Sequence, residues 1–181
     1  MRRAVFLDRD GVLNQPVVRE GKPYPPQSVL ELRILPGVPE SLAALRDAGF
    51  LLVVTTNQPD VATGKQSATV VEAMHARLRA ELALDAIKAC YHGDADGCEC
   101  RKPKPGMLLQ AAREFDIDLL RSFMVGDRWR DVAASQAAGC TSFFIDYGYR
   151  EKRPEPPYIA VKSLAEAVTH ILADFPKENK D

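Results

Sequence analysis

The sequence lacks any hydrophobic run near the roughly 20 apolar residues that a bilayer-spanning helix requires, so we expect no membrane partner. It also lacks an excess of either charge, since 24 basic and 25 acidic residues give a net charge of −1. This balance provides no broad electrostatic attraction to nucleic acid or to an anionic membrane. A small anionic ligand remains compatible with it, because a local basic pocket does not show in a net charge.

Cysteine is scarce as well: there are four, and three of them lie within eleven residues. The 181 residues suffice for one domain with a hydrophobic core that needs no disulfide staples, so we expect a single domain over residues 1–181. The apolar stretch Ala4–Leu7 is too short for a signal peptide and favours a first buried strand. We therefore expect a cytoplasmic protein, and a monomer.

Short apolar runs alternate with helical patterns along the chain, which is typical of an α/β fold with a mostly parallel sheet. Near-continuous apolar runs such as LLVV indicate strands that are buried on both faces. Strands are predicted at Ala4–Leu7, 51–55, 86–91, 122–125 and Thr141–Ile145. Helices are predicted at 38–48, 67–82, Gly106–Phe115, Trp129–Ala138 and 163–173. Residues 15–35, with four prolines and no clean period, are predicted to form an ordered excursion.

Polar residues with useful chemistry follow four of the predicted strands. They are Asp8 and Asp10, Thr56 and Asn57, the segment 92–104, and Asp127 with Asp131. In a parallel sheet the carboxyl ends of the strands share one edge, and ligands bind beyond that edge. The sequence therefore predicts one site built from four strand ends.

Asp8 and Asp10 follow the first strand in the run FLDRDG. Two carboxylates this close repel each other unless a cation lies between them, and a hard cation such as Mg²⁺ suits oxygen ligands. One carboxylate can attack phosphorus to form an aspartyl-phosphate, while the other protonates the leaving group and then activates water. The alternative is that both residues, with Gly11, only form a turn.

The next two strand ends offer groups that bind phosphate. The run TTNQ supplies the Thr56 hydroxyl and the Asn57 amide, and RKPKPG supplies Lys102, a cation that can offset phosphate charge. The alternatives are an ordinary strand-to-helix turn and a solvated basic loop. Asp127 follows the fourth strand as a third carboxylate, and Asp131 is either a supporting carboxylate or a helix first-turn residue.

A cysteine–histidine cluster precedes the basic loop, with the pattern Cys90-x-His92-x5-Cys98-x-Cys100. Three thiolates and one imidazole complete a tetrahedral Zn²⁺ site without a free position for water, so the predicted zinc is structural. A metal would hold a polar, glycine-containing loop that cannot pack a core, and would position the two residues that follow it.

These motifs, in this order, resemble the phosphatases of the haloacid-dehalogenase (HAD) superfamily over residues 4–145. The resemblance implies a Rossmann-like three-layer sandwich without a large cap domain. It also implies roles for individual residues. Asp8 is the nucleophile, Asp10 the general acid/base, Thr56, Asn57 and Lys102 the phosphate ligands, and Asp8, Asp127 and the Asp10 carbonyl the Mg²⁺ ligands.

The zinc loop narrows the resemblance to the zinc-loop members of the superfamily. In the heptose branch of these, residues matching Arg101 and Lys102 contact the substrate. Their substrates include heptose bisphosphate and histidinol phosphate. The runs FLDRDGVLN and KPKPGM resemble the heptose branch, which favours a sugar-phosphate substrate. The five-residue spacing between His92 and Cys98 resembles the histidinol branch as closely, and Thr63 replaces an arginine common in the heptose branch.

A different class of function is a zinc-stabilised binding module that has lost catalysis. The complete set of Asp8, Asp10, Lys102 and Asp127 argues against it, because a degenerate site is expected to lose one of them.

Overall fold

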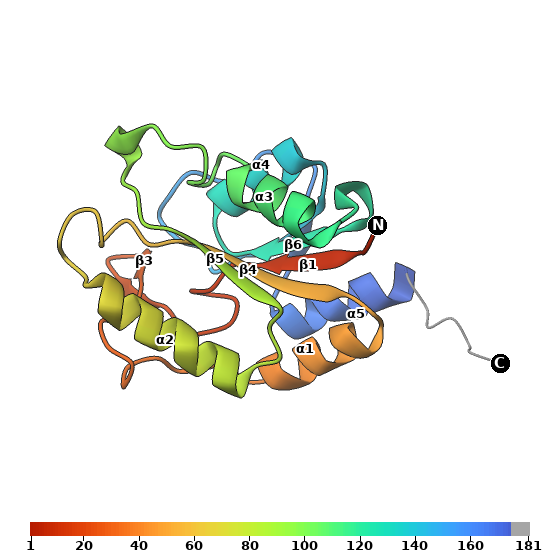
Figure 1. Ribbon diagram of the computed structural model, residues 1–181, viewed down its shortest axis with the longest axis horizontal. Helices are drawn as coiled ribbons and strands as arrows, with labels where there is room; N and C mark the ends of the chain where they lie inside the picture. The colour runs from red at the N-terminus through yellow and green to blue at the C-terminus, as the bar shows by residue number, and fades with distance from the viewer. Residues whose placement is uncertain (175–181) are drawn as a thin grey trace.

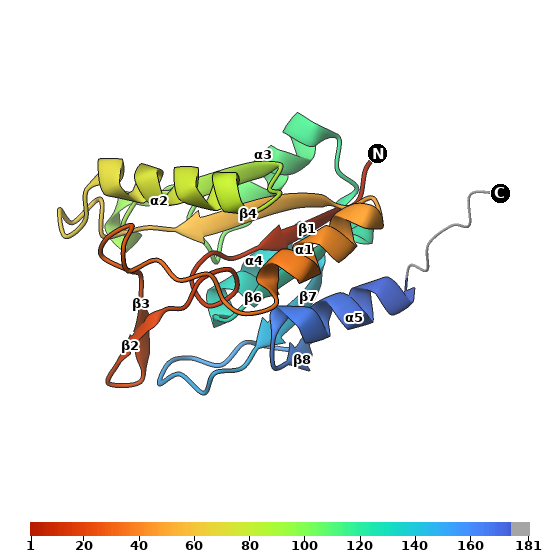
Figure 2. The same cartoon turned by 90° about the horizontal axis from the view of Figure 1, so that it is seen from below.

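The computed structural model describes residues 1–174, in which a six-stranded parallel sheet is covered by helices on both faces (Figures 1 and 2). The strand order is β5–β4–β1–β6–β7–β8, and every pairing in the sheet is parallel. The strands are β1 (Ala4–Leu7), β4 (Leu51–Asn57), β5 (Ala86–Cys90), β6 (Phe123–Gly126), β7 (Thr141–Ile145) and β8 (Ile159–Val161). A separate antiparallel hairpin joins β2 (Val17–Arg19) to β3 (Lys22–Tyr24).

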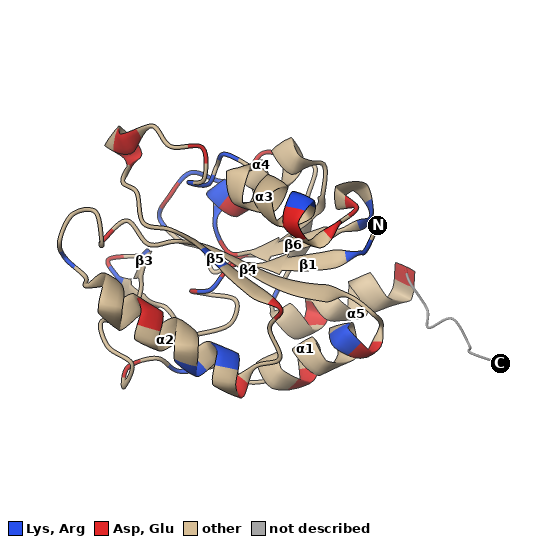
Figure 3. Cartoon of the chain, viewed as in Figure 1, with Lys and Arg blue, Asp and Glu red and all other residues tan. Residues whose placement is uncertain are grey.

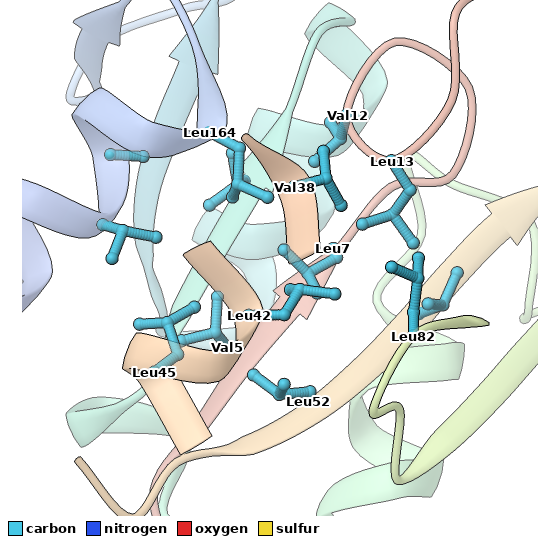
Figure 4. Packing of buried hydrophobic residues seen from close by; sticks show 14 of the residues in the cluster. Val5, Leu7, Val12, Leu13, Val38, Leu42, Leu45, Leu52, Leu82 and Leu164 are labelled. Carbon is cyan, nitrogen blue, oxygen red and sulfur yellow. The ribbon is translucent and has the colours of Figure 1, made fainter. Parts of the chain in front are cut away.

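Side chains alternate between the two faces of β1, which explains why three layers form. Val5 and Leu7 belong to the larger core cluster, under α1 (Val38–Asp47), α2 (Ala68–Glu81) and α5 (Leu164–Asp174) (Figure 4). Ala4 and Phe6 belong to the other cluster, under α3 (Gly106–Phe115) and α4 (Trp129–Ala138). The two clusters fill the two interfaces of an α/β/α sandwich.

The predicted fold class is confirmed, and the five predicted strands and five predicted helices all form with ends within two residues of the predicted positions. Two features were not predicted: the short edge strand β8 and the β2–β3 hairpin within residues 15–35. The hairpin turn places both Glu20 (φ 51°) and Gly21 (φ 76°) in the left-handed region. Two-residue hairpin turns of this kind usually begin with Asn, Asp or Gly, so glutamate gives a weak signal.

The sheet directs its functional loops to one side. In Figure 1 the hairpin and the loop after β5 lie at the end of the sheet opposite to the N-terminus. This is the edge where the parallel strands have their carboxyl ends. Blue and red segments are interspersed along the helices and loops in Figure 3. Across residues 1–174, none of the helices combines the length and the apolar character needed to cross a membrane.

Candidate active site

A buried lysine holds the first carboxylate of the site. Asp8 comes directly after β1, and Lys102 Nζ donates to Asp8 Oδ1 at 2.9 Å and to the Thr55 carbonyl at 2.7 Å. The same ammonium forms an ion pair with Asp131 Oδ1 at 2.5 Å. Burial alone lowers a lysine's pKa, but the charges of Asp131 and Asp8 outweigh it and raise the pKa of Lys102. The lysine is therefore a permanent cation between two carboxylates.

Three carboxylates crowd this edge of the sheet. Oxygen atoms of Asp8, Asp127 and Asp131 lie within 4.8 Å of one another. Burial and the Asp131 charge raise the pKa of Asp8 to about 6. Burial and the charges of Asp8 and Asp131 raise the pKa of Asp127 well above its usual value. One lysine balances only part of this negative charge, so the cluster favours a further cation.

Asp127 has one oxygen in use and one available. Its Oδ2 accepts a hydrogen bond from the Tyr149 hydroxyl at 2.9 Å. Its Oδ1 is buried and finds no hydrogen-bond donor among residues 1–174. An unpaired buried carboxylate oxygen is costly unless a metal ion or water satisfies it. Together with the acidic cluster, this oxygen fits a hard divalent cation such as Mg²⁺.

Gly11 makes the approach of Asp127 possible. Its φ is +91°, and a Cβ built at this position would lie 1.9 Å from Asp127 Oδ2. A larger residue would therefore displace the carboxylate as well as strain the turn. Gly11 therefore has two roles: it allows the chain to turn, and it leaves space for the Asp127 carboxylate, which follows another strand.

Asp10 is held away from the acidic cluster by three side chains. Its carboxylate accepts from Arg9 at 3.0 Å, from Asn14 Nδ2 at 2.9 Å and from Gln58 Nε2 at 2.9 Å. Burial raises the pKa of Asp10, but the Arg9 charge and these hydrogen bonds outweigh it and lower that pKa overall. The carboxylate of Asp10 is consequently ionised, and it is not one of the three clustered carboxylates.

Arg9 is itself fully buried, and His75 supports it from α2. The Arg9 Nη1 group lies 3.3 Å from His75 Nε2. Because guanidinium can only donate, Nε2 must accept, which leaves the proton on Nδ1, 3.5 Å from a Glu72 carboxylate oxygen. Burial, followed by the Arg9 charge, lowers the pKa of His75 to about 4. His75 is thus a neutral support for the Arg9–Asp10 pair.

The predicted phosphate ligands lie where two strands and the basic loop meet. The Thr56 hydroxyl accepts from Gln58 Nε2 at 2.9 Å. The Asn57 amide brackets the Lys102 backbone, because Nδ2 donates to the Lys102 carbonyl at 2.9 Å and Oδ1 accepts from its N–H at 3.1 Å. Asn57 therefore fixes the position of the lysine, and both Thr56 and Asn57 line the cavity.

A cavity of about 290 Å³ opens above these groups. Asp8, Asp10 and Lys102 belong to its lining, as do Lys22 and Tyr24 of the hairpin and Arg128 and Arg130 from the start of α4. Arg101, which the resemblance predicts to contact the substrate, is not part of that lining, and neither is Thr63. Arg101 Nε instead donates to Asp94 Oδ1 at 2.8 Å.

The four predicted zinc ligands meet in the loop after β5. The Sγ atom of Cys100 lies 2.9 Å from that of Cys90 and 3.5 Å from that of Cys98, and 3.2 Å from His92 Nδ1. One ligand atom from each residue lies within 4.8 Å of the others. Four soft ligands this close fit a tetrahedral Zn²⁺ ion.

Several residues of the site were not among those predicted from the sequence. Gln58 and Arg9 adjoin predicted residues, so the strand-end rule could have found them. Tyr149 and Arg130 gave no signal, because Tyr149 lies in a loop with no recognised motif and Arg130 resembles any exposed helix residue. Their roles depend on how β6, α4 and the loop after β7 come together.

The chain is similar to known phosphatases. A family model described as HAD-hydrolase-like matches residues 99–167. D-glycero-beta-D-manno-heptose-1,7-bisphosphate 7-phosphatase from Pseudomonas aeruginosa is 39% identical over 81% of this chain and 83% of that protein. The protein of the same name from Pasteurella multocida is 36% identical over 98% of this chain and 96% of its own.

A solved structure extends the similarity to three dimensions. The crystal structure of D,D-heptose 1,7-bisphosphate phosphatase from B. bronchiseptica, complexed with magnesium and phosphate, matches with a TM-score of 0.81 and 32% identity. The match covers 95% of this chain and 99% of that one. It therefore includes both the sheet and the loops that carry the site.

The crowded carboxylates predict a measurable effect on stability. The pKa of Asp127 is higher in the folded than in the unfolded chain. The magnesium-free protein therefore loses stability as the pH rises from the unfolded-state pKa to the folded-state pKa. We expect Asp127→Asn to raise the free energy of unfolding at pH 7 by more than about 1 kcal/mol in magnesium-free buffer, measured by urea denaturation. We expect added Mg²⁺ to stabilise the wild type more than the variant.

Asp116→Asn is the matched control, because Asp116 is exposed and its left-handed backbone suits asparagine. It should leave stability unchanged within about 0.5 kcal/mol. A decrease in stability for Asp127→Asn without magnesium would contradict the electrostatic account.

Proposed function

Because this chain belongs to the HAD-like hydrolases and is a phosphatase, we propose that it hydrolyses a sugar phosphate through an aspartyl-phosphate on Asp8, with Mg²⁺ as cofactor. The proposed substrate is D-glycero-D-manno-heptose 1,7-bisphosphate, cleaved at the 7-phosphate, which is the reaction named for the relatives. The observation that carries the mechanism is the Asp8 carboxylate, held by buried Lys102 on the lining of a cavity.

In the first step an Asp8 oxygen attacks phosphorus, and the bond from phosphorus to the sugar oxygen breaks. Lys102 orients Asp8 and balances the charge that gathers on the phosphoryl oxygens. The Thr56 hydroxyl, on the same cavity wall, is a ligand for those oxygens. Asp10 supplies the proton that the departing sugar alkoxide takes up.

In the second step Asp10 takes a proton from water, and the water oxygen attacks phosphorus to release phosphate and free Asp8. The donors around Asp10 favour its ionised form, which is the base that this step requires. For the first step Asp10 must carry a proton. A phosphate dianion nearby favours that protonation, because a like charge raises a carboxyl's pKa.

Asp8, Asp127 and the Asp10 carbonyl are the proposed Mg²⁺ ligands. When bound, the ion neutralises phosphate and carboxylate charge. Asp131 supports the site differently, since its Oδ2 accepts from the Arg128 N–H at the start of α4 while Oδ1 pairs with Lys102. Asp131 thus serves both as the helix first-turn residue and as the supporting carboxylate that the sequence left as alternatives.

Cys90, His92, Cys98 and Cys100 are the proposed ligands of a structural Zn²⁺. The zinc loop they define (residues 90–100) carries Asp94, which binds Arg101 at 2.8 Å and Arg130 at 3.4 Å. Its role is therefore to order the rim of the cavity, and no chemical step depends on the zinc.

The cavity rim supports a substrate with a second negative charge. Lys22 from the hairpin and Arg130 from α4 line the cavity in addition to Lys102. A heptose bisphosphate has a second phosphate to meet these cations. Histidinol phosphate is the second candidate, because the five-residue spacing between His92 and Cys98 resembles the histidinol branch as closely. It carries an amine instead, which two rim cations repel.

The proposed reaction is tested by phosphate release at saturating Mg²⁺ from heptose 1,7-bisphosphate, other sugar phosphates and histidinol phosphate. We expect the heptose bisphosphate to have the highest kcat/KM, and Asp8→Asn to lower kcat by roughly three orders of magnitude or more, because the nucleophile is lost. Asp116→Asn is again the control. Equal release by wild type and Asp8→Asn, or a tenfold preference for histidinol phosphate, would contradict the proposal.

A second test concerns the rim cations. We expect Lys22→Ala with Arg130→Ala to raise KM for heptose 1,7-bisphosphate roughly tenfold, the equivalent of about 1.4 kcal/mol, and to leave KM for the 7-monophosphate within about twofold. Lys65→Ala, an exposed lysine outside the cavity lining, is the control. If Arg101→Ala has the larger effect, the second phosphate lies toward the zinc loop instead.

Loss of zinc should disorder the rim. We expect Cys98→Ser to lose bound zinc by elemental analysis, to lower Tm, and to raise KM more than it lowers kcat, because Arg130 loses its anchor while Asp8 and Lys102 do not. Cys140→Ser is the matched control, because Cys140 is buried in the core and is not one of the four proposed ligands. This variant should keep its bound zinc even if its Tm changes. Full zinc content in Cys98→Ser would contradict the ligand set.

A further inference from the structure

The loop after β7 (residues 146–153, the β7 loop) sends two tyrosine side chains into the acidic edge of the sheet. We infer that Tyr149 is a positioning residue for the divalent cation: its hydroxyl fixes the Asp127 carboxylate so that the other oxygen faces the ion. This inference rests on the proposed Mg²⁺ site, and it concerns a segment for which the sequence motifs assign no role.

The first support is that the two carboxylate oxygens of Asp127 have different surroundings. The Tyr149 hydroxyl donates to Oδ2 at 2.9 Å, while buried Oδ1 has no donor in the described part of the chain. The phenol is the donor in this bond, because an ionised carboxylate oxygen can only accept. A carboxylate bound on one oxygen has one rotamer favoured over the others, and here that rotamer leaves Oδ1 buried without a donor. Asp127 also belongs to the acidic cluster, since one of its oxygens lies within 4.8 Å of oxygens of Asp8 and Asp131.

The second support comes from Tyr147, which contacts Gly11, the residue against which Asp127 packs. Its hydroxyl donates to the Gly11 carbonyl at 2.9 Å, and its ring lies 5.5 Å from that of Tyr149. Gly11 is the residue whose missing side chain leaves space for Asp127. The two tyrosines therefore fix both the carboxylate and the turn against which it packs.

The third support is the anchoring of the β7 loop itself. Arg128 Nε donates to both carboxylate oxygens of Glu151, at 2.9 and 2.8 Å. The Arg150 N–H donates to the Gly21 carbonyl of the β2–β3 hairpin at 2.8 Å. In Figure 2 the blue β7 loop runs beside that hairpin. A loop fixed at both points can hold Tyr149 in place, and it joins the hairpin wall of the cavity to the cation site.

The test is Tyr149→Phe, which removes one hydroxyl and keeps the ring. We expect the Kd for Mg²⁺, measured by isothermal titration calorimetry on the zinc-loaded protein without substrate, to rise about tenfold. In phosphate release, the Mg²⁺ concentration for half-maximal rate should rise similarly, while kcat at saturating Mg²⁺ stays within about threefold. A general loss of structure would instead lower kcat and Tm together.

Two further variants keep the inference falsifiable. Tyr158→Phe is the matched control, since Tyr158 packs on Phe144 and should leave Mg²⁺ binding unchanged. Tyr147→Phe keeps the bond to Asp127, so it should change the Kd less than Tyr149→Phe. An equal effect of both would indicate loop order alone and overturn the inference.

A Kd within twofold of wild type for Tyr149→Phe would also overturn it. That outcome leaves the proposed function intact. A wild type that binds no Mg²⁺ at all would instead contradict the proposed cofactor, and this inference with it.

Discussion

The site depends on the placement of one buried ammonium group among three buried carboxylates. Lys102 Nζ pairs with Asp8 and Asp131, while Asp127 completes the acidic cluster and forms no ion pair within 4.0 Å among residues 1–174. Buried charges are tolerated only when they are paired. Asp8 and Asp131 share the charge of Lys102, whereas positive charge is deficient at Asp127. Burial and this deficiency together explain the raised pKa values of Asp8 and Asp127, and they favour the divalent cation that we propose for this edge.

Much of the chain serves to hold this imbalance in place. Neighbours from other elements help to fix these charged groups: Asn57 of β4 brackets the Lys102 backbone, and His75 of α2 supports Arg9, which pairs with Asp10. The sheet makes this possible, because its parallel strands deliver these groups to one edge while two apolar layers keep the strands rigid. Stability comes from the core, and the edge can remain electrostatically strained.

The sequence was sufficient for five of the six strands of the sheet and for the polar residues in the loops that follow them. Apolar runs, and the polar residues that follow them, are local signals. Asp8, Lys102 and Asp127 could therefore be assigned to one edge of the sheet from the sequence alone. Contacts that depend on loop conformation could not be predicted. Tyr149 meets Asp127 only because the β7 loop folds back, and Arg101 turns to Asp94 although its neighbour Lys102 enters the site. Such contacts depend on the conformation of single loop residues, and the hydrophobic periodicity of a sequence does not predict loop conformation.

Substrate recognition must come from the rim, since no large cap closes over the cavity in residues 1–174. The rim is built from separate elements, namely the hairpin, the start of α4 and the zinc loop. Thr63 is not part of the cavity lining and contributes no cation to it. Lys22 and Arg130 place positive charge on the cavity from other elements, with Asp94 of the zinc loop anchoring Arg130. The charge that the rim presents can therefore be maintained while the residues that provide it change, because a phosphate group responds to the position of a cation and not to its place in the chain.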